Sequence, residues 1–149
     1  MTFAVSSFVS ATILLGSGAA FAQTKDEADI TKEIQRFCQQ YDNTWNTKGA
    51  ATVANTLLAK DVVFVPPTGA VVKGAETVAK IWGDMYKEPT VHKCTVEGAR
   101  AEGNGAWAYG EVTITGNPSG HVRWTGFEVK RNGHWQVQLL HVTPIKDSE

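Results

Sequence analysis

The segment LLAKDVVFVPPTG, from Leu57 to Gly69, belongs to the stretch from Ile30 to Gly74 around which the chain is organised. Residues 62–65 at its centre are β-branched or aromatic and form a run too short for a helix, which Pro66-Pro67 closes. We therefore predict a strand that ends in a turn. The pattern before this strand is helical, and beyond one further helix the pattern is that of strands only.

Two helices are predicted before the strand. Apolar residues of the first helix recur at helical spacing: Ile30, Ile34, Phe37, Tyr41 and Trp45. Thr24 and Glu27 have the spacing of a capping box at its start. Residues 46–49 (Asn-Thr-Lys-Gly) break the pattern, and a short Ala-rich helix is predicted over residues 50–59.

A third helix and four strands are predicted after the turn. Gly74 precedes a helix whose apolar stripe includes Trp82 and Tyr86, and Pro89 stops it. The strand-like segments lie at roughly 91–101, 106–115, 121–130 and 134–145, separated by Gly- and Asn-rich turns typical of hairpins. Helices first and strands afterwards indicate an α+β fold with the helices on one face of a curved antiparallel sheet.

The N-terminal 22 residues have the pattern of a cleaved secretory leader. They carry no charge, include an apolar run and end in Ala20-Phe21-Ala22. We expect a signal peptide over 1–22, one domain over 23–149, and a periplasmic or secreted protein. Because no Lys or Arg precedes Lys25, a start codon further upstream and an uncleaved or lipid-facing leader remain open.

The charge balance argues against several partner classes. The chain has 14 Lys and Arg against 15 Asp and Glu, and its longest basic run is Lys130-Arg131, so no nucleic-acid partner is expected. The histidines show no metal-ligand spacing, and Gly103-Asn104-Gly105 reads as a hairpin turn rather than a phosphate cradle. We expect no metal, no cofactor and, after cleavage of the leader, no membrane association.

Two cysteines, Cys38 and Cys94, leave two alternatives. In an oxidising compartment they would form the one possible intramolecular disulfide. Alternatively, both are free and buried, where a cysteine behaves as a small hydrophobic residue. The second alternative is favoured, because a domain of residues 23–149 is large enough to fold without a cross-link.

The order of these elements resembles a known superfamily. A first helix ending in Trp45-Asn46, a short helix, a strand, a Pro-Thr-Gly turn and a Gly before a third helix resemble the start of the nuclear transport factor 2-like superfamily, in its SnoaL-like and ketosteroid-isomerase-like branch. The resemblance covers essentially residues 23–149. It implies a cone in which three N-terminal helices pack on a strongly curved antiparallel sheet around an internal pocket.

The resemblance carries over only one catalytic group. In ketosteroid isomerases a Tyr five residues before the Asn that ends the first helix donates a hydrogen bond to the substrate oxyanion, and Tyr41 stands at that position before Asn46. The family's catalytic Asp is replaced by Pro66, and the second oxyanion donor aligns approximately with Thr125. Isomerisation of the steroid type by that machinery is therefore not expected.

Candidate site residues follow from the alternation of side chains along the strands, with the large aromatics placed inside the cone. The predicted pocket-lining residues are Trp45, Trp82, Tyr86, His92, Trp107, Tyr109, Arg123, Thr125, Phe127 and Leu139. Glu111, His141 and Tyr41 are the predicted catalytic groups, with the carboxylate and the imidazole moving a proton. The alternative is that Glu111 lies at the rim and pairs with Arg123, while His141 is a packed core histidine.

Two function classes stay open. The first is an exported protein that holds a small, mostly apolar ligand and performs acid/base chemistry of the isomerase, hydrolase or dehydratase type. The second is a non-catalytic ligand-binding or association module. A homodimer through the open face of the sheet is also expected, with an outward apolar patch made of Val112, Ile114, Trp124, Leu140 and Val142.

Overall fold

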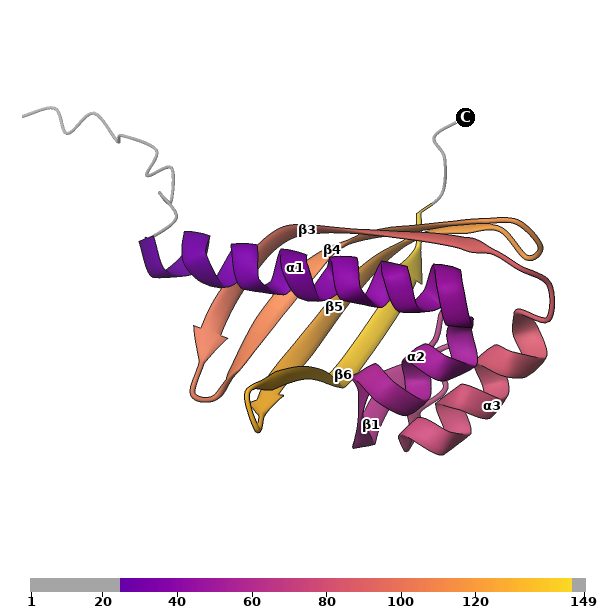
Figure 1. The fold of residues 1–149 in the computed structure, drawn as a ribbon, viewed down its shortest axis with the longest axis horizontal. Helices are drawn as coiled ribbons and strands as arrows, with labels where there is room; N and C mark the ends of the chain where they lie inside the picture. Colours follow the sequence, from indigo (N-terminus) through magenta and orange to yellow (C-terminus); the bar gives the residue numbers. More distant parts are fainter. Residues whose placement is uncertain (1–24, 146–149) are drawn as a thin grey trace, which may run out of the picture.

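A computed structural model describes residues 25–145 of the chain. The helices are α1 (Lys25–Lys48), α2 (Ala50–Leu57) and α3 (Ala75–Met85). The strands are β1 (Leu58–Val65), β2 (Val72–Lys73), β3 (Val91–Glu102), β4 (Gly105–Thr115), β5 (Gly120–Arg131) and β6 (His134–Pro144). The α+β fold with three helices before a meander of strands is confirmed (Figure 1). The predicted leader and the capping Thr24 lie outside the described residues.

The six strands form one sheet in the order β2-β1-β6-β5-β4-β3. Strands β3 to β6 are joined as antiparallel neighbours, and the hairpin at Asn132-Gly133 has the positive φ angles, 51° and 79°, that its sequence predicts. The sequence pattern did not indicate that β1 pairs with β6 in parallel, nor the short β2. The first long strand of the sheet therefore lies beside the last one.

Helix α1 covers the free edge of β3 with polar side chains. Four of them accept hydrogen bonds from backbone N–H groups along β3: Thr31 from Ala99 at 3.1 Å, Gln35 from Val96 at 3.0 Å, Asp42 from Cys94 at 3.0 Å, and Asn46 from His92 at 2.7 Å. We call these four residues the α1 polar stripe. Because they follow the helical period, the helix lies along the strand and its apolar stripe turns toward the sheet.

The core has two parts. Beneath the C-terminal half of α1, Trp45, Val53, Val62 and Trp82 pack with α2, α3 and β1. Beneath its N-terminal half, Ile34 and Cys38 pack on small residues and one large aromatic of the sheet: Ala99, Ala106, Ala108 and Trp124. The alanines let α1 approach the sheet closely at this end.

The predicted face of β4 is wrong. Ala106 and Ala108 are buried under α1, whereas Trp107 and Tyr109 are 46% and 48% exposed on the outer face. The close approach of α1 leaves room only for small side chains inside, so the large aromatics lie outside. Trp107 packs against Phe127 there, with 4.8 Å between ring centroids.

The predicted inward and outward faces are also exchanged on β5 and on the second half of β6. On β5, Trp124 and Glu128 are buried. On β6, Val137 is buried as predicted, but the register then shifts between Phe127 and Glu128, which leaves Gln138 as an extra residue. Beyond Gln138 the inward and outward residues are therefore exchanged relative to the prediction. Leu140 and Val142 face the helices, while Leu139 and His141 lie on the outer side. The proposed outward patch is therefore also wrong, since Val112, Ile114, Trp124, Leu140 and Val142 all face inward.

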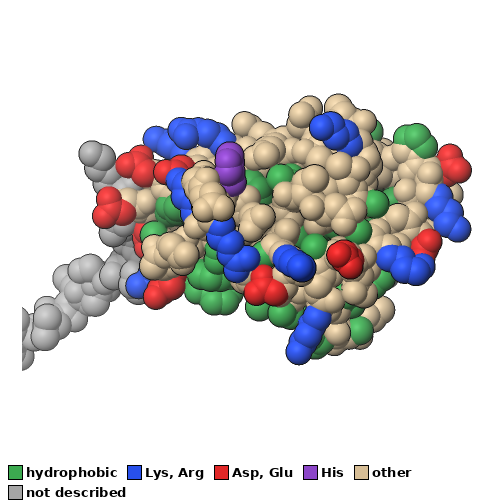
Figure 2. All heavy atoms as spheres, turned by 60° about the horizontal axis from the view of Figure 1, so that its bottom comes forward, with side chains coloured by type: hydrophobic (Ala, Val, Ile, Leu, Met, Phe, Trp, Pro, Cys, Tyr) green, Lys and Arg blue, Asp and Glu red, His purple; other side chains and the backbone are tan. Residues whose placement is uncertain are grey.

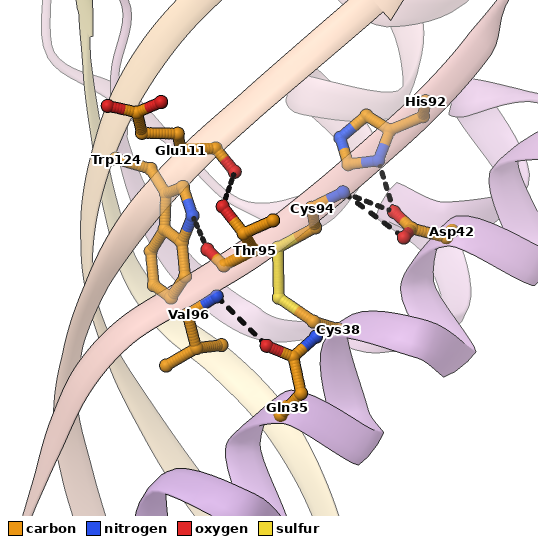
Figure 3. The surroundings of a disulfide bond; sticks show 9 residues. All are labelled: Gln35, Cys38, Asp42, His92, Cys94, Thr95, Val96, Glu111 and Trp124. Atoms are coloured by element: carbon orange, nitrogen blue, oxygen red, sulfur yellow. Dashed lines mark hydrogen bonds and ion pairs between the residues drawn. A yellow bond between two sulfur atoms is a disulfide. The ribbon is translucent and has the colours of Figure 1, made fainter.

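Cys38 and Cys94 form a disulfide, so the favoured alternative of two free cysteines is wrong. Their Cα atoms lie 5.7 Å apart, within the range that a disulfide spans. Cys38 lies on the same side of α1 as the α1 polar stripe, between Gln35 and Asp42, and for that reason its side chain points at the edge strand (Figure 3). The bond joins the middle of α1 to β3 beside the hydrogen bonds already described.

Candidate functional site

A cavity of about 140 Å³ lies between α1, α3 and the inner face of the sheet. Its wall is predominantly apolar, and the side chains in it that can donate or accept a proton are Tyr41, Tyr86, His92 and Glu128. A cavity of about 150 Å³ in another protein holds benzene, whereas pockets for drug-sized ligands run to several hundred Å³. The cavity therefore has room for about one six-membered ring.

A histidine of the wall is paired with an aspartate. Nδ1 of His92, on β3, lies 2.7 Å from Oδ1 of Asp42, on α1. The imidazole is 5% exposed, and the carboxylate also accepts the backbone N–H of Cys94. A carboxylate can only accept, so Nδ1 carries the proton and donates it to Asp42. In the neutral imidazole of this tautomer the lone pair is on Nε2.

His92 is held on every side. The side-chain oxygen of Asn46 accepts a hydrogen bond from the backbone N–H of His92 at 2.7 Å, and the side-chain NH₂ of Asn46 donates to the backbone carbonyl of His92 at 3.0 Å. The imidazole packs against the rings of Trp45 and Tyr41, with centroids at 4.6 Å and 5.2 Å. Trp45 is fixed in turn by a 2.9 Å hydrogen bond from Nε1 to the hydroxyl of Thr90. The imidazole is therefore pre-positioned before any ligand enters.

Two tyrosines complete this end of the cavity. Burial raises the pKa of Tyr41 well above its ordinary value, and the nearby Tyr86 and Asp42 raise it further. Burial also raises the pKa of Tyr86. Both hydroxyls therefore stay protonated at neutral pH and can donate hydrogen bonds.

Glu128 is the other ionisable group of the wall. It is 3% exposed, and its Oε2 has no hydrogen-bond partner within residues 25–145. Burial raises the pKa of Glu128 to about 8. In register Glu128 lies opposite Ala106, whereas His92 lies opposite Ile114 of the same strand. The carboxyl and the imidazole therefore stand toward opposite ends of the inner face.

The predicted catalytic pair Glu111 and His141 does not lie in the cavity. Glu111 accepts hydrogen bonds from Arg123 at 2.6 Å and from His121 at 3.1 Å on the outer face, and His141 is exposed. Arg123 and then His121 hold the pKa of Glu111 below its usual value. The alternative pairing of Glu111 with Arg123 is present, but on the outer face rather than at the rim, and the alternative of a packed core histidine is wrong. The physical reason is the face shift of β4 and β6.

The predicted lining residues divide by element. Tyr41 and four of the ten predicted lining residues contact the cavity: Trp45, Trp82, Tyr86 and His92. The other six are corrected, because their strands present them to the outer side: Trp107, Tyr109, Arg123, Thr125, Phe127 and Leu139. Asp42 and Glu128 were missed. The spacing of polar residues along α1 could have indicated Asp42. Glu128 would have been predicted to line the cavity if the other face of β5 had been placed inward.

The outer face carries a shallow hollow of about 400 Å³, whose wall includes Glu97, Arg100, Trp107 and Tyr109. On the face of the molecule that Figure 2 shows, basic and acidic side chains are interspersed and neither sign gathers into a broad patch. Across residues 25–145, no group of His, Cys, Asp and Glu side chains is arranged to hold a metal ion, and none of the helices could cross a bilayer.

A comparison with protein families matches residues 35–138 to the SnoaL-like domain. Solved structures share the fold. A nuclear transport factor 2-like protein of unknown function from Pseudomonas putida is 20% identical, with a TM-score of 0.63 over 82% of this chain and 91% of that one. A putative aromatic ring hydroxylase from Novosphingobium aromaticivorans is 14% identical, with a TM-score of 0.64 over 80% and 92%.

A third structure has a different kind of name. It is a putative calcium/calmodulin dependent protein kinase II association domain from Xanthomonas campestris, 19% identical, with a TM-score of 0.64 over 78% of this chain and 89% of that one. At these identities the likeness shows the fold alone. No curated protein sequence matches the chain.

Proposed function

The chain belongs to the SnoaL-like domain family, and we propose that it is an exported protein whose cavity binds a small, mostly apolar ligand, on which His92 moves a proton. The observation that carries this proposal is the 2.7 Å contact between Asp42 and His92, which lies in the wall of an apolar cavity. Such an arrangement suits reactions of the isomerase, dehydratase or hydrolase type.

Three side chains of the site have a part in such a reaction. Nε2 of His92 takes a proton from the ligand, or from a water that attacks it, and later returns it. Asp42 keeps the ring in the required tautomer and stabilises the imidazolium that forms. Tyr41 donates a hydrogen bond to the oxygen on which negative charge develops, in an environment with little water to screen the interaction.

The size of the cavity limits the ligand. About 140 Å³ accommodates a single ring or a short acyl chain, and no Lys or Arg stands in the described wall to pair with an anionic group. The ligand is therefore a compact, neutral and mainly apolar compound.

The test is proton transfer by the full-length purified protein. One-ring ketones, epoxides and β-hydroxy carbonyl compounds are incubated with it in D₂O, and deuterium exchange, hydration or dehydration is followed by ¹H NMR. We expect one class to react, with a loss on the order of 10²–10⁴ in rate in His92→Gln. His134→Gln, which removes an exposed hairpin histidine, is the matched control. Equal rates in His92→Gln and wild type, with the fold retained by circular dichroism, would contradict the proposal.

Association is the second candidate. The exposed rings of Trp107 and Tyr109 on the outer face favour it, because a soluble monomer seldom leaves neighbouring aromatics in water. The fold is also that of a protein named as an association domain. We propose a homodimer through this face. It is compatible with the cavity, which lies on the other side of the sheet.

Export is supported by two features. The uncharged leader has the pattern of a signal peptide, and Cys38 and Cys94 form a disulfide, a bond that persists in oxidising compartments. We propose a periplasmic or secreted location.

A further inference from the structure

Glu128 is a buried carboxyl group, one oxygen of which has no partner in the described protein. It lies on the inner face of β5 in the cavity wall, is 3% exposed, and its Oε2 makes no hydrogen bond within residues 25–145. Its Oε1 lies against Gly126, where an added Cβ would come within 2.5 Å of that oxygen. Buried polar groups in folded proteins nearly always have a partner, so this one requires an explanation.

The wall offers Glu128 no counter-ion. Among the residues that line the cavity, none is Lys or Arg, and the other ionisable groups are Tyr41, Tyr86 and His92. His92 already donates to Asp42 and stands toward the other end of the inner face. Glu128 is a residue of the cavity wall, so a ligand in the cavity is a candidate partner for its carboxyl group.

We propose that Glu128 is a ligand-anchoring residue that donates a hydrogen bond to an acceptor oxygen of the bound compound, so that the cavity selects neutral carbonyl compounds over amines, acids and hydrocarbons. This inference rests on the proposed binding of a small ligand in the cavity. It does not depend on the proton transfer by His92.

The chemistry of the carboxyl decides the ligand class. A protonated carboxyl has one O–H to donate, and a ketone, aldehyde, ester or lactone oxygen can only accept. Burial raises the pKa of Glu128 to about 8, so the protonated form prevails at neutral pH. An anionic ligand would meet no cation in the wall. An ammonium ligand would create an ion pair among apolar side chains, which is costly because both charges lose their hydration.

A hydrogen bond to Glu128 would also fix the orientation of the ligand in the cavity. An acceptor oxygen held at Glu128 places the apolar body of the ligand against residues such as Trp124, Val137 and Leu140. A compound without that oxygen lacks the hydrogen bond that would favour one orientation over another.

The experiment compares three probes of nearly equal shape against the full-length protein at pH 7. They are cyclohexanone, methylenecyclohexane, in which a CH₂ group replaces the oxygen, and cyclohexylamine. Binding is followed by tryptophan fluorescence, since Trp45, Trp82 and Trp124 line the cavity, and by ligand-observed NMR. We expect wild type to bind the ketone about tenfold more tightly than methylenecyclohexane, as one hydrogen bond at a buried site implies.

Two variants separate the hydrogen bond from the shape of the residue. Glu128→Gln keeps an N–H donor at the same place and should retain the preference for the ketone. Glu128→Met has a similar volume without a donor and should lose it, while methylenecyclohexane binds at least as well as to wild type. Circular dichroism and the melting temperature verify that both variants fold.

A ketone preference that survives in Glu128→Met overturns the inference, as do tighter binding of cyclohexylamine than of the ketone and the absence of any binding to wild type. His92→Gln serves as the separating variant. If it binds the ketone as wild type does and neither protein catalyses proton exchange, the catalytic proposal fails while the anchoring role of Glu128 stands.

Discussion

The backbone N–H of Cys94 donates to both carboxylate oxygens of Asp42, at 3.0 and 3.1 Å, while the side chain of the same cysteine is bonded to Cys38 one turn earlier in α1. Figure 3 shows the two connections side by side, with His92 on the same strand. The covalent link between helix and strand therefore also fixes the distance between the carboxylate and the imidazole.

Removing this link should weaken both the fold and the site. We expect the double variant Cys38→Ala/Cys94→Ala to lower the free energy of unfolding by about 2–4 kcal/mol, because the disulfide closes a loop between residues 56 apart. Urea denaturation measures the change. Dithiothreitol should shift the midpoint of wild type in the same direction and leave the double variant unchanged. An identical midpoint for reduced and oxidised wild type would contradict this prediction.

Replacing Asp42 by Asn should abolish most of the proton transfer while leaving the protein folded. The amide would present a donor to Nδ1 of His92 and favour the wrong tautomer, so we expect a loss of about 10²-fold or more in rate. Asp84→Asn is the control, since Asp84 is exposed and pairs with Lys80 on α3. The deuterium-exchange assay gives the rates. A rate in Asp42→Asn equal to that of the control would show that the pair is not catalytic.

Glu128 should make the stability of the protein depend on pH. Its pKa is raised by burial from 4.5 to about 8 in the folded state, so between these values the folded protein binds the extra proton. The free energy of unfolding must then fall as pH rises through this window. Relative to Glu128→Gln, wild type should lose about 3 kcal/mol between pH 5 and pH 8. Urea denaturation at several pH values, with parallel curves as the contrary result, tests this expectation.

The outer face should carry the dimer contact. Trp107→Glu places a charge among the exposed aromatics and should convert a dimer into a monomer, which size-exclusion chromatography with light scattering measures. Met85→Glu is the control, because Met85 is an exposed apolar residue on α3, away from this face. If wild type itself elutes with the mass of one chain, the dimer proposal is lost.

Cleavage of the leader should give a mature protein that begins at Gln23. The intact mass of protein recovered from the periplasm or medium of an expressing bacterium checks the position. Changing Ala20 and Ala22 to bulky residues should block cleavage there, because the signal requires small residues. A full-length mass for the recovered wild type would refute the assignment.

The elements and their order could be predicted from the sequence, because turn residues and helical spacing are local signals. The Asn132-Gly133 hairpin and the helical stripe through Trp45 are examples. Which face of each strand points inward could not be predicted from the size of the side chains. Trp107 and Tyr109 lie outside because α1 packs closely on Ala106 and Ala108, and that approach is a property of the whole fold.

The site was harder to predict than the fold for a related reason. His141 follows an extra residue, Gln138, that reverses the alternation in the middle of β6, and no local sequence signal marks that position. Asp42 and His92 meet only because α1 lies along β3, 50 residues apart in sequence. The alternation of side chains along a strand does not show which residue of a helix will contact the edge of the sheet.

The α1 polar stripe has a consequence for how this protein behaves among copies of itself. An uncovered edge strand offers a ladder of free N–H and C=O groups on which a foreign strand can grow, and this is how many sheets begin to aggregate. Here the N–H groups of His92, Cys94, Val96 and Ala99 are already occupied by side chains of the helix. The opposite edge, β2, is only two residues long. Both borders of the sheet are thus poor templates for fibre growth, and reducing the disulfide, by letting α1 lift from β3, would expose one of them.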